Sequence, residues 1–330
     1  MKNDLILNKQ LPLINYLKAL AIVCVILIHS KVRIFIISPY LINLAVPLFI
    51  FIMGFNYSNS FIRKGYNKIS ELYNTKELIK KFLKFSIPYF ICTFCLSVSD
   101  NLFFLIDKSN ENGRYFFVLI VQLLFIIPLL FYYIKKNLKK SLIILFFLYI
   151  FYEIFCTILI TDYDLFFILK SYKFMVLRYI LLVGFGIAFS LDKDFFKSKF
   201  VNILSFLFGI ICIFILHYLQ PNMYPFFMKH NLWNATESLS VFYIFPVIRF
   251  LYFKNIKFKG IFHTVLTLIG NASWYIFLVQ MVYFGMFPCY KINGLSFSKI
   301  ILNIFICVVL GVLFYNAVEF VTHKISQNRR

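Results

Sequence analysis

The sequence predicts an all-α integral membrane protein, and three observations lead to that prediction. The chain of 330 residues is 62% hydrophobic, 21% aromatic and only 14% charged, whereas a soluble domain is about half apolar and a quarter charged. Its mean hydropathy is +0.84. Long apolar stretches follow one another along the whole chain, with only short polar segments between them.

We expect about ten transmembrane helices in a single membrane domain covering residues 1–330, because a helix crosses a bilayer with about 20 apolar residues. The expected spans are 12–32, 37–57, 84–106, 115–134, 141–161, 174–191, 200–219, 238–253, 264–287 and 299–320. No appended soluble domain is expected. The first apolar stretch is too long for a cleavable signal peptide and lacks a small-residue cleavage site.

The basic residues predict the orientation of these spans. The chain carries a net charge of +21, which in a soluble protein would suggest nucleic acid as a partner. Here, instead, alternate loops and both termini hold 22 of the 34 lysines and arginines, and the opposite loops hold nine. The positive-inside rule therefore places both termini in the cytoplasm, which requires an even number of spans, and no nucleic-acid partner is expected.

Cysteine usage gives no sign of a disulfide framework or of a metal centre. All seven cysteines lie in or at the ends of apolar stretches. Cys92 and Cys95 form a CxxC pair, but in an apolar helix we interpret them as small packing residues. A structural metal would need further ligands, and no histidine-rich cluster provides them. We therefore expect no metal and no tightly bound cofactor.

The first span carries the best candidates for catalysis, Lys18 and His29. An ionisable group inside a span costs about 3 kcal/mol on insertion scales, so it is a functional candidate by default. The two residues are eleven positions apart, which is close to three turns, so they share one helix face about 16 Å apart. His29 can act as base and acid near neutral pH. The alternative is that each side chain snorkels to its nearer interface.

Other polar residues in or beside the spans are weaker candidates for substrate binding. Arg178 forms a planar fork suited to carboxylate or phosphate, and the buried Glu153 needs a partner or a proton. Gln122 and Gln280 are mid-span amides, which more often connect helices than bind substrate. Before the third span, Lys81 and Lys84 share a helix face and could meet substrate phosphates, although anionic lipid headgroups explain such a pair equally well.

An ordered set of motifs resembles the acyltransferase 3 family of membrane-bound O-acyltransferases. The first is a basic residue followed, eleven positions later, by histidine in the first span. The second is the Pro-aromatic run of the second span, and the third is a basic pair before Pro-Tyr. The matching residues are Lys18, His29, Pro47, Phe49, Phe51, Gly54, Phe55, Lys81, Lys84, Pro88 and Tyr89. The family more often has Arg where this chain has Lys18, and Met53 replaces a serine.

The later spans continue the resemblance. The fourth span has a mid-span glutamine before proline, the sixth has the small residues of a Phe-x-x-Gly run, and the ninth resembles a Ser-x-x-x-Tyr-x-x-His stretch. The matching residues are Gln122, Pro128, Gly184, Gly186 and Ser273. The resemblance makes Ser273 a further candidate for substrate binding, beside Gln280. Phe277 and Gln280 stand where the family commonly has Tyr and His, so this chain has no histidine at that position of the ninth span.

The resemblance implies a reaction. Acyl-CoA, usually acetyl-CoA, would be the donor substrate, and the acceptor would be a hydroxyl of a sugar in a cell-envelope glycan or lipid-linked saccharide. His29 would deprotonate that hydroxyl or relay the acyl group. Lys18 or Arg178 would stabilise charge on the thioester oxygen or orient the donor. A multi-pass protein of a bacterial-type inner membrane is implied, in contact with membrane lipid and with an envelope-synthesis protein as a further candidate partner.

Two other functions fit the composition. Ten spans with buried lysine, arginine and glutamate also suit a transporter or flippase for a lipid-linked saccharide or organic anion. Inverted repeats would favour transport, and the sequence shows none. The other alternative is a non-catalytic membrane subunit of an envelope-synthesis complex.

Overall fold

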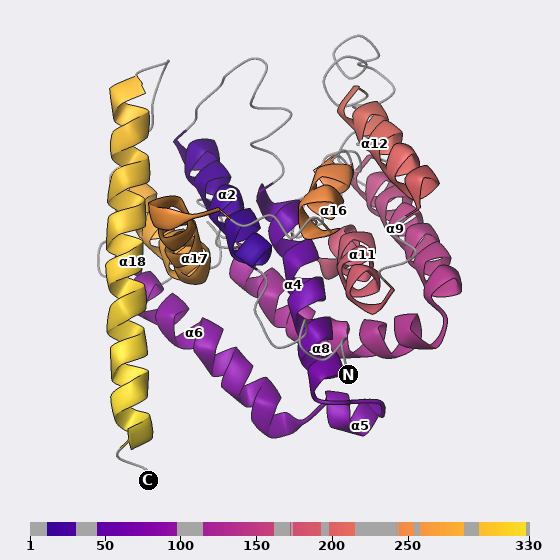
Figure 1. The fold of residues 1–330 in the computed structure, drawn as a ribbon, viewed down its shortest axis with the longest axis horizontal. Helices are drawn as coiled ribbons and strands as arrows, with labels where there is room; N and C mark the ends of the chain where they lie inside the picture. Colours follow the sequence, from indigo (N-terminus) through magenta and orange to yellow (C-terminus); the bar gives the residue numbers. More distant parts are fainter. Residues whose placement is uncertain are drawn as a thin grey trace. The chain divides into compact units, whose positions relative to one another are not determined.

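The computed structural model describes residues 12–30, 45–97, 115–161, 172, 174–192, 198–214, 242, 244–253, 258–286 and 297–327. In these residues a helix overlaps each of the expected spans (Figure 1). The helices are α2 (Pro12–His29), α4 (Ala45–Arg63), α6 (Thr75–Ser97), α8 (Tyr115–Lys136), α9 (Leu138–Thr161), α11 (Ile180–Leu191), α12 (Lys199–Phe214), α16 (Phe245–Phe253), α17 (Gly260–Met286) and α18 (Phe297–Gln327). A short helix, α5 (Ile69–Leu72), precedes α6, and a 3-10 turn, η3 (Val176–Tyr179), precedes α11.

Five helices are long and apolar enough to cross a membrane by themselves. They are α2, α4, α8, α17 and the Phe297–Lys324 part of α18. The segments Val176–Leu191 and Lys199–Cys212 are apolar but shorter. The all-helical architecture of a membrane protein is therefore confirmed for the described residues, whereas the total of ten spans stays a prediction.

Several helices extend further toward their polar ends than hydropathy alone predicts, with α4, α6 and α18 as the clearest cases. α4 continues to Arg63, and α6 begins at Thr75, nine residues before the expected span. Backbone hydrogen bonding continues through a polar segment as long as the residues favour a helix, and the lysines and glutamate at the start of α6 are good helix formers. Hydropathy therefore locates the apolar part of a helix better than its ends.

The structure divides into two compact units. The first unit contains Val46–Leu83 and Tyr115–Ile256, and the second contains Leu11–Ala45, Lys84–Arg114 and Lys257–Arg330. Each unit is described by itself below.

In the first unit, α4 and α11 cross with backbones in close contact. A Cβ atom added to Gly186 would lie 2.2 Å from the Phe51 carbonyl oxygen, and one added to Gly54 would lie 2.5 Å from that of Val183. Only glycine permits this approach, as in other close crossings of membrane helices. One turn beyond, the Ser190 hydroxyl donates to the Ser58 hydroxyl at 2.5 Å.

The direction of the helices in the first unit follows from their contacts. Phe51 and Phe55 of α4 pack on Phe189 of α11, and Phe49 and Phe61 pack on Phe116 and Phe131 of α8. Along α4 and α8 the residue numbers increase together from Phe49–Phe116 to Phe61–Phe131. Along α4 and α11 they increase together from Phe51–Gly186 to Ser58–Ser190, so α4, α8 and α11 are parallel. This is the arrangement that alternating second, fourth and sixth spans require.

The second unit is built on α2, α17 and α18, which pack against one another (Figure 1). A Cβ atom added to Gly270 of α17 would lie 2.2 Å from the Asn15 carbonyl oxygen of α2, and the rings of His29 and Phe284 lie 6.5 Å apart. In both contacts the α17 residue comes 255 positions after its α2 partner. The residue numbers therefore increase together along the two helices, so α2 and α17 are parallel and in register. Gly311 of α18 meets Ile276 of α17.

Ile276 of α17 meets Gly311 of α18, whereas Tyr283, later in α17, bonds Asn303, earlier in α18. The residue numbers run in opposite directions, so α18 is antiparallel to α17. These directions match the alternation expected for a first, a ninth and a tenth span. The cytoplasmic location of the termini stays a prediction.

Candidate functional site

A column of polar side chains lies along the parallel pair α2 and α17. Because the two helices keep one register, Lys18 is level with Ser273 and His29 is level with Phe284. Gln280 lies between these levels on α17, and it is fully buried, while Ser273 is 7% exposed. Lys18 and His29 are both half-buried. The predicted first-span pair and the two ninth-span candidates therefore belong to one helix pair.

The length of this column limits what any single residue can do. Eleven helical residues between Lys18 and His29 correspond to a rise of about 16 Å. A catalytic base must come within about 3 Å of the proton it removes. Side chains at these two positions could therefore act only on different parts of an extended ligand, because a single carbonyl group is too small to reach both.

A hydrogen-bond network fixes the His29 end of the column. The Tyr283 hydroxyl donates to Asn303 Oδ1 at 3.0 Å, and Asn303 Nδ2 donates to the Ser30 hydroxyl at 3.1 Å. Ser30 is fully buried and Asn303 is 1% exposed. The network joins α17, α18 and the residue directly after His29. It therefore sets the position of the last turn of α2, from which the imidazole projects.

The Lys18 end of the column gathers hydrogen-bond donors from α2, α6 and α17. Lys84, on α6, has an unfavourable electrostatic interaction with Lys18. The ring of Phe85 meets the ring of Trp274 edge to face at 5.5 Å. Trp274 follows Ser273, which is level with Lys18, so these contacts place Lys84 near the same level of α17.

Two buried polar atoms at this level have no hydrogen-bond partner among the described residues, namely Ser86 Oγ and Trp274 Nε1. Buried polar groups are nearly always satisfied, so an orphaned pair needs an explanation such as a bound ligand. Two ammonium groups, an indole N–H and a hydroxyl are all donors. Such a set suits a ligand rich in anionic or carbonyl oxygen.

Glu153 and Arg178 form a separate cluster within the first unit. The Tyr172 hydroxyl donates to Glu153 Oε2, and the guanidinium carbon of Arg178 lies 4.8 Å from the centre of the Tyr172 ring. Glu153 and Arg178 are each 3% exposed. Glu153 and Arg178 therefore share a tyrosine, which provides a hydrogen bond to one and a cation–π contact to the other.

Gln122 of α8 supports the segment that carries Arg178. Its side-chain N–H donates to the Phe174 carbonyl, and its carbonyl accepts from the Val176 N–H, each at 2.9 Å. These bonds satisfy backbone groups at the start of η3, where a helix has no internal partners. The structure therefore gives Gln122 the helix-connecting role that mid-span amides commonly have.

Lys81 belongs to the first unit, although it is only three residues from Lys84. Its ammonium lies 4.1 Å from the ring centre of Tyr57 and 5.1 Å from that of Phe61. Burial lowers the pKa of Lys81 to about 8, an effect that the nearby Glu77 carboxylate partly opposes. The side chain is therefore held by aromatic faces and can lose its proton in the mildly alkaline range.

Several residues of these sites were not predicted from the sequence. Ser30, Tyr283 and Asn303 beside His29, and Ser86 and Trp274 near Lys18, come from four different helices. The one available signal was that Asn303 and Ser86 are polar residues within apolar stretches. In the described part of the chain, no group of three or more His, Cys, Asp or Glu side chains is arranged to hold a metal ion.

The helical architecture, with apolar helices long enough to cross a bilayer and ionisable residues among them, defines a helical membrane protein. A family model described as an acyltransferase domain, that of the acyltransferase 3 family, matches residues 11–316. The chain therefore belongs to the acyltransferase 3 family and is a membrane acyltransferase, and the resemblance drawn from its motifs is confirmed. No curated protein and no solved structure matches the chain.

Proposed function

We propose that this protein is an O-acetyltransferase of the plasma membrane that moves an acetyl group from cytoplasmic acetyl-CoA to a hydroxyl of a sugar. The acceptor sugar belongs to a cell-envelope glycan or a lipid-linked saccharide. The observation that carries the proposal is the polar column of the second unit, which has a set of donors near Lys18 at one level and His29 about 16 Å away at another.

Lys18 and Lys84 bind the donor in this mechanism. Their ammonium groups and the N–H of Trp274 are suited to the phosphate and amide oxygens of a coenzyme A ester. An extended donor anchored there can direct its thioester along α2 and α17 toward His29. The axial separation therefore favours a donor-orienting role for Lys18 over direct stabilisation of the thioester oxygen.

His29 is the general base. Its neutral imidazole takes the proton of the acceptor hydroxyl while the hydroxyl oxygen attacks the carbonyl carbon of the thioester. The carbon–sulfur bond then breaks, and the leaving thiolate takes the proton from the imidazolium. The Ser30–Asn303–Tyr283 network holds the last turn of α2 in place during this exchange. Arg178, Glu153 and Lys81 stay candidates for substrate contacts within the first unit.

Transfer of radiolabelled acetyl groups from acetyl-CoA in membranes tests this proposal, with analysis of the labelled glycan. His29→Ala should lower the rate of transfer by about 10²–10⁴-fold, as loss of a general base does. His323→Ala is the matched control, because His323 lies exposed near the end of α18. Lys18→Arg should retain transfer, whereas Lys18→Leu should raise the donor KM strongly.

Membrane insertion separates catalysis from folding in these variants. Lys18→Leu removes a charge from a span, so insertion becomes easier rather than harder. Full transfer activity in both His29→Ala and Lys18→Leu would refute the mechanism, and a transporter would then explain the buried charges better.

A further inference from the structure

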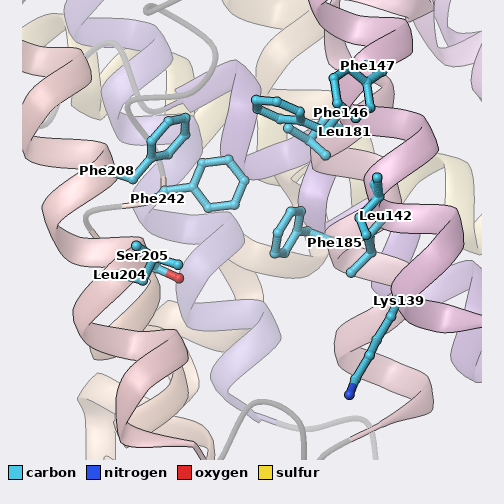
Figure 2. Close-up of a pocket in the computed structure, with 11 residues that line it drawn as sticks. Lys139, Leu142, Phe146, Phe147, Leu181, Phe185, Leu204, Ser205, Phe208 and Phe242 are labelled. Carbon is cyan, nitrogen blue, oxygen red and sulfur yellow. The ribbon is translucent and has the colours of Figure 1, made fainter.

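The first unit contains an apolar groove that takes no part in the proposed acyl transfer. It has a volume of about 620 Å³ and lies among α9, α11, α12 and Phe242. This is within the roughly 300–1,000 Å³ range of ligand-binding pockets. Figure 2 shows phenylalanine rings around the groove and Lys139 at one end of it, with its amine directed away from the rings.

The floor of the groove is aromatic and rigid. The rings of Phe185 and Phe242 meet edge to face at 4.7 Å, and Phe208 lies 5.8 Å from Phe242. Ser205 also lines the groove, but its hydroxyl donates to the Val201 carbonyl of its own helix at 2.7 Å. The described residues that line the groove therefore offer hydrocarbon contact and, apart from the lysine, no side-chain polar group that is not already hydrogen-bonded.

Lysines are concentrated at the mouth of the groove. The turn from α8 to α9 carries four lysines, Lys135, Lys136, Lys139 and Lys140, and no acidic residue occurs between positions 115 and 152. Lys139 and Lys140 are both exposed, but only Lys139 lines the groove. An occupant must therefore combine a long apolar part with an anionic group at its end.

The dimensions of the groove match one leaflet of a bilayer. From Lys139 to Phe147, the groove-lining residues of α9 cover eight helical steps, or a rise of about 12 Å. Half of a bilayer core about 30 Å thick is about 15 Å deep. A lipid whose phosphate lies at Lys139 would thus extend its acyl chain along α9 toward Phe147.

From these observations we infer that the groove is a binding site for an anionic phospholipid, with an acyl chain between α9, α11 and α12 and the headgroup phosphate on Lys139. The site lies within the first unit and is independent of the residues assigned to acyl transfer. It belongs to the class of basic, hydrophobic sites by which membrane proteins select anionic lipids.

Native mass spectrometry of the delipidated protein in a nonionic detergent tests the site, with phosphatidylglycerol and phosphatidylcholine of identical acyl chains as probes. Lys139→Gln should weaken phosphatidylglycerol binding about fivefold, the contribution of one lysine facing an anionic lipid. Lys140→Gln should leave binding unchanged. Leu204→Trp should reduce binding of phosphatidylglycerol by filling the groove, whereas Leu207→Trp, equally exposed on α12 but outside the lining, should not.

Four results would overturn the inference. Equal binding of phosphatidylcholine and phosphatidylglycerol would exclude headgroup recognition, and equal losses in Lys139→Gln and Lys140→Gln would show a diffuse charge effect. Unchanged binding in Leu204→Trp would place the lipid elsewhere. A stable dimer that forms through this face and excludes lipid would show that a second copy of the chain is the occupant. None of these results depends on transferase activity.

Discussion

The contact between Gly270 and Asn15 allows a test of whether the register of α2 and α17 positions the donor substrate. In Gly270→Ala the new Cβ would lie 2.2 Å from the Asn15 carbonyl oxygen, whereas ordinary van der Waals contact begins at 3.4 Å. The backbones of α2 and α17 must therefore separate by about 1 Å, the difference between these two distances. Lys18 is one turn from this contact, so its distance from Trp274 and Ser273 would change by a similar amount.

The expected consequence is a loss of activity larger than the loss of stability. Overpacking of this kind typically costs about 1–3 kcal/mol, but a displacement of about 1 Å in a reaction geometry can lower the rate about 10²-fold. Turnover of acetyl-CoA and the thermal midpoint of the purified protein measure the two effects separately. We expect transfer to fall by about two orders of magnitude while the protein still folds and inserts.

Gly311→Ala provides the matched control. Its Cβ would lie 2.5 Å from the Ile276 Cα, so the clash is similar, but it separates α17 from α18 rather than from α2. Comparable destabilisation with a much smaller loss of transfer is expected. Wild-type turnover in Gly270→Ala, or an equal loss of turnover in both variants, would refute the idea that the α2–α17 register positions the donor.

Three further predictions concern the neighbouring contacts. Asn303→Leu removes the hydrogen bonds that the buried hydroxyls of Tyr283 and Ser30 make with Asn303. It should therefore destabilise the protein by about 1–3 kcal/mol and lower kcat by a larger factor than it changes KM; a melting curve and turnover identical to wild type would contradict this. Because the pKa of Lys81 is about 8, its ammonium is lost as the pH rises through 8, so the donor KM should increase above that pH if Lys81 contacts phosphate. In Lys81→Arg, which stays charged, the donor KM should remain flat, and a parallel rise in both proteins would exclude the contact. Tyr172→Phe removes the hydroxyl that donates to the buried Glu153, so the thermal midpoint should fall while the donor KM is unchanged; a raised KM would instead place substrate at this cluster.

The positions of the helices could be predicted because hydropathy is a local property. Each expected span overlaps a described helix, since about 20 consecutive apolar residues satisfy their backbone only as a helix in lipid. The shared face of Lys18 and His29 also followed from helical periodicity alone. The family could be inferred from motif order, since those residues keep their types and spacing along the chain.

The tertiary contacts of each candidate site residue could not be predicted from the local sequence. Lys81 and Lys84 are three residues apart and share a helix face, yet Lys81 lies over Tyr57 and Phe61 whereas Lys84 faces Lys18. Gln122 resembled other mid-span amides, and only its bonds to the backbone of η3 distinguish its role. Such contacts join residues at least 20 positions apart, and no periodicity within a single helix encodes them.

The sequence by itself determined that this protein is a helical membrane acyltransferase with an ionisable pair on its first span. The tertiary structure decided what surrounds that pair. It placed Ser273 and Gln280 beside α2, joined Ser30 to Asn303 and Tyr283, and brought Ser86 and Trp274 to the level of Lys18. The physical reason is that apolar patterning fixes which residues form a helix, whereas the close approach at glycines such as Gly270 fixes the register in which two helices meet.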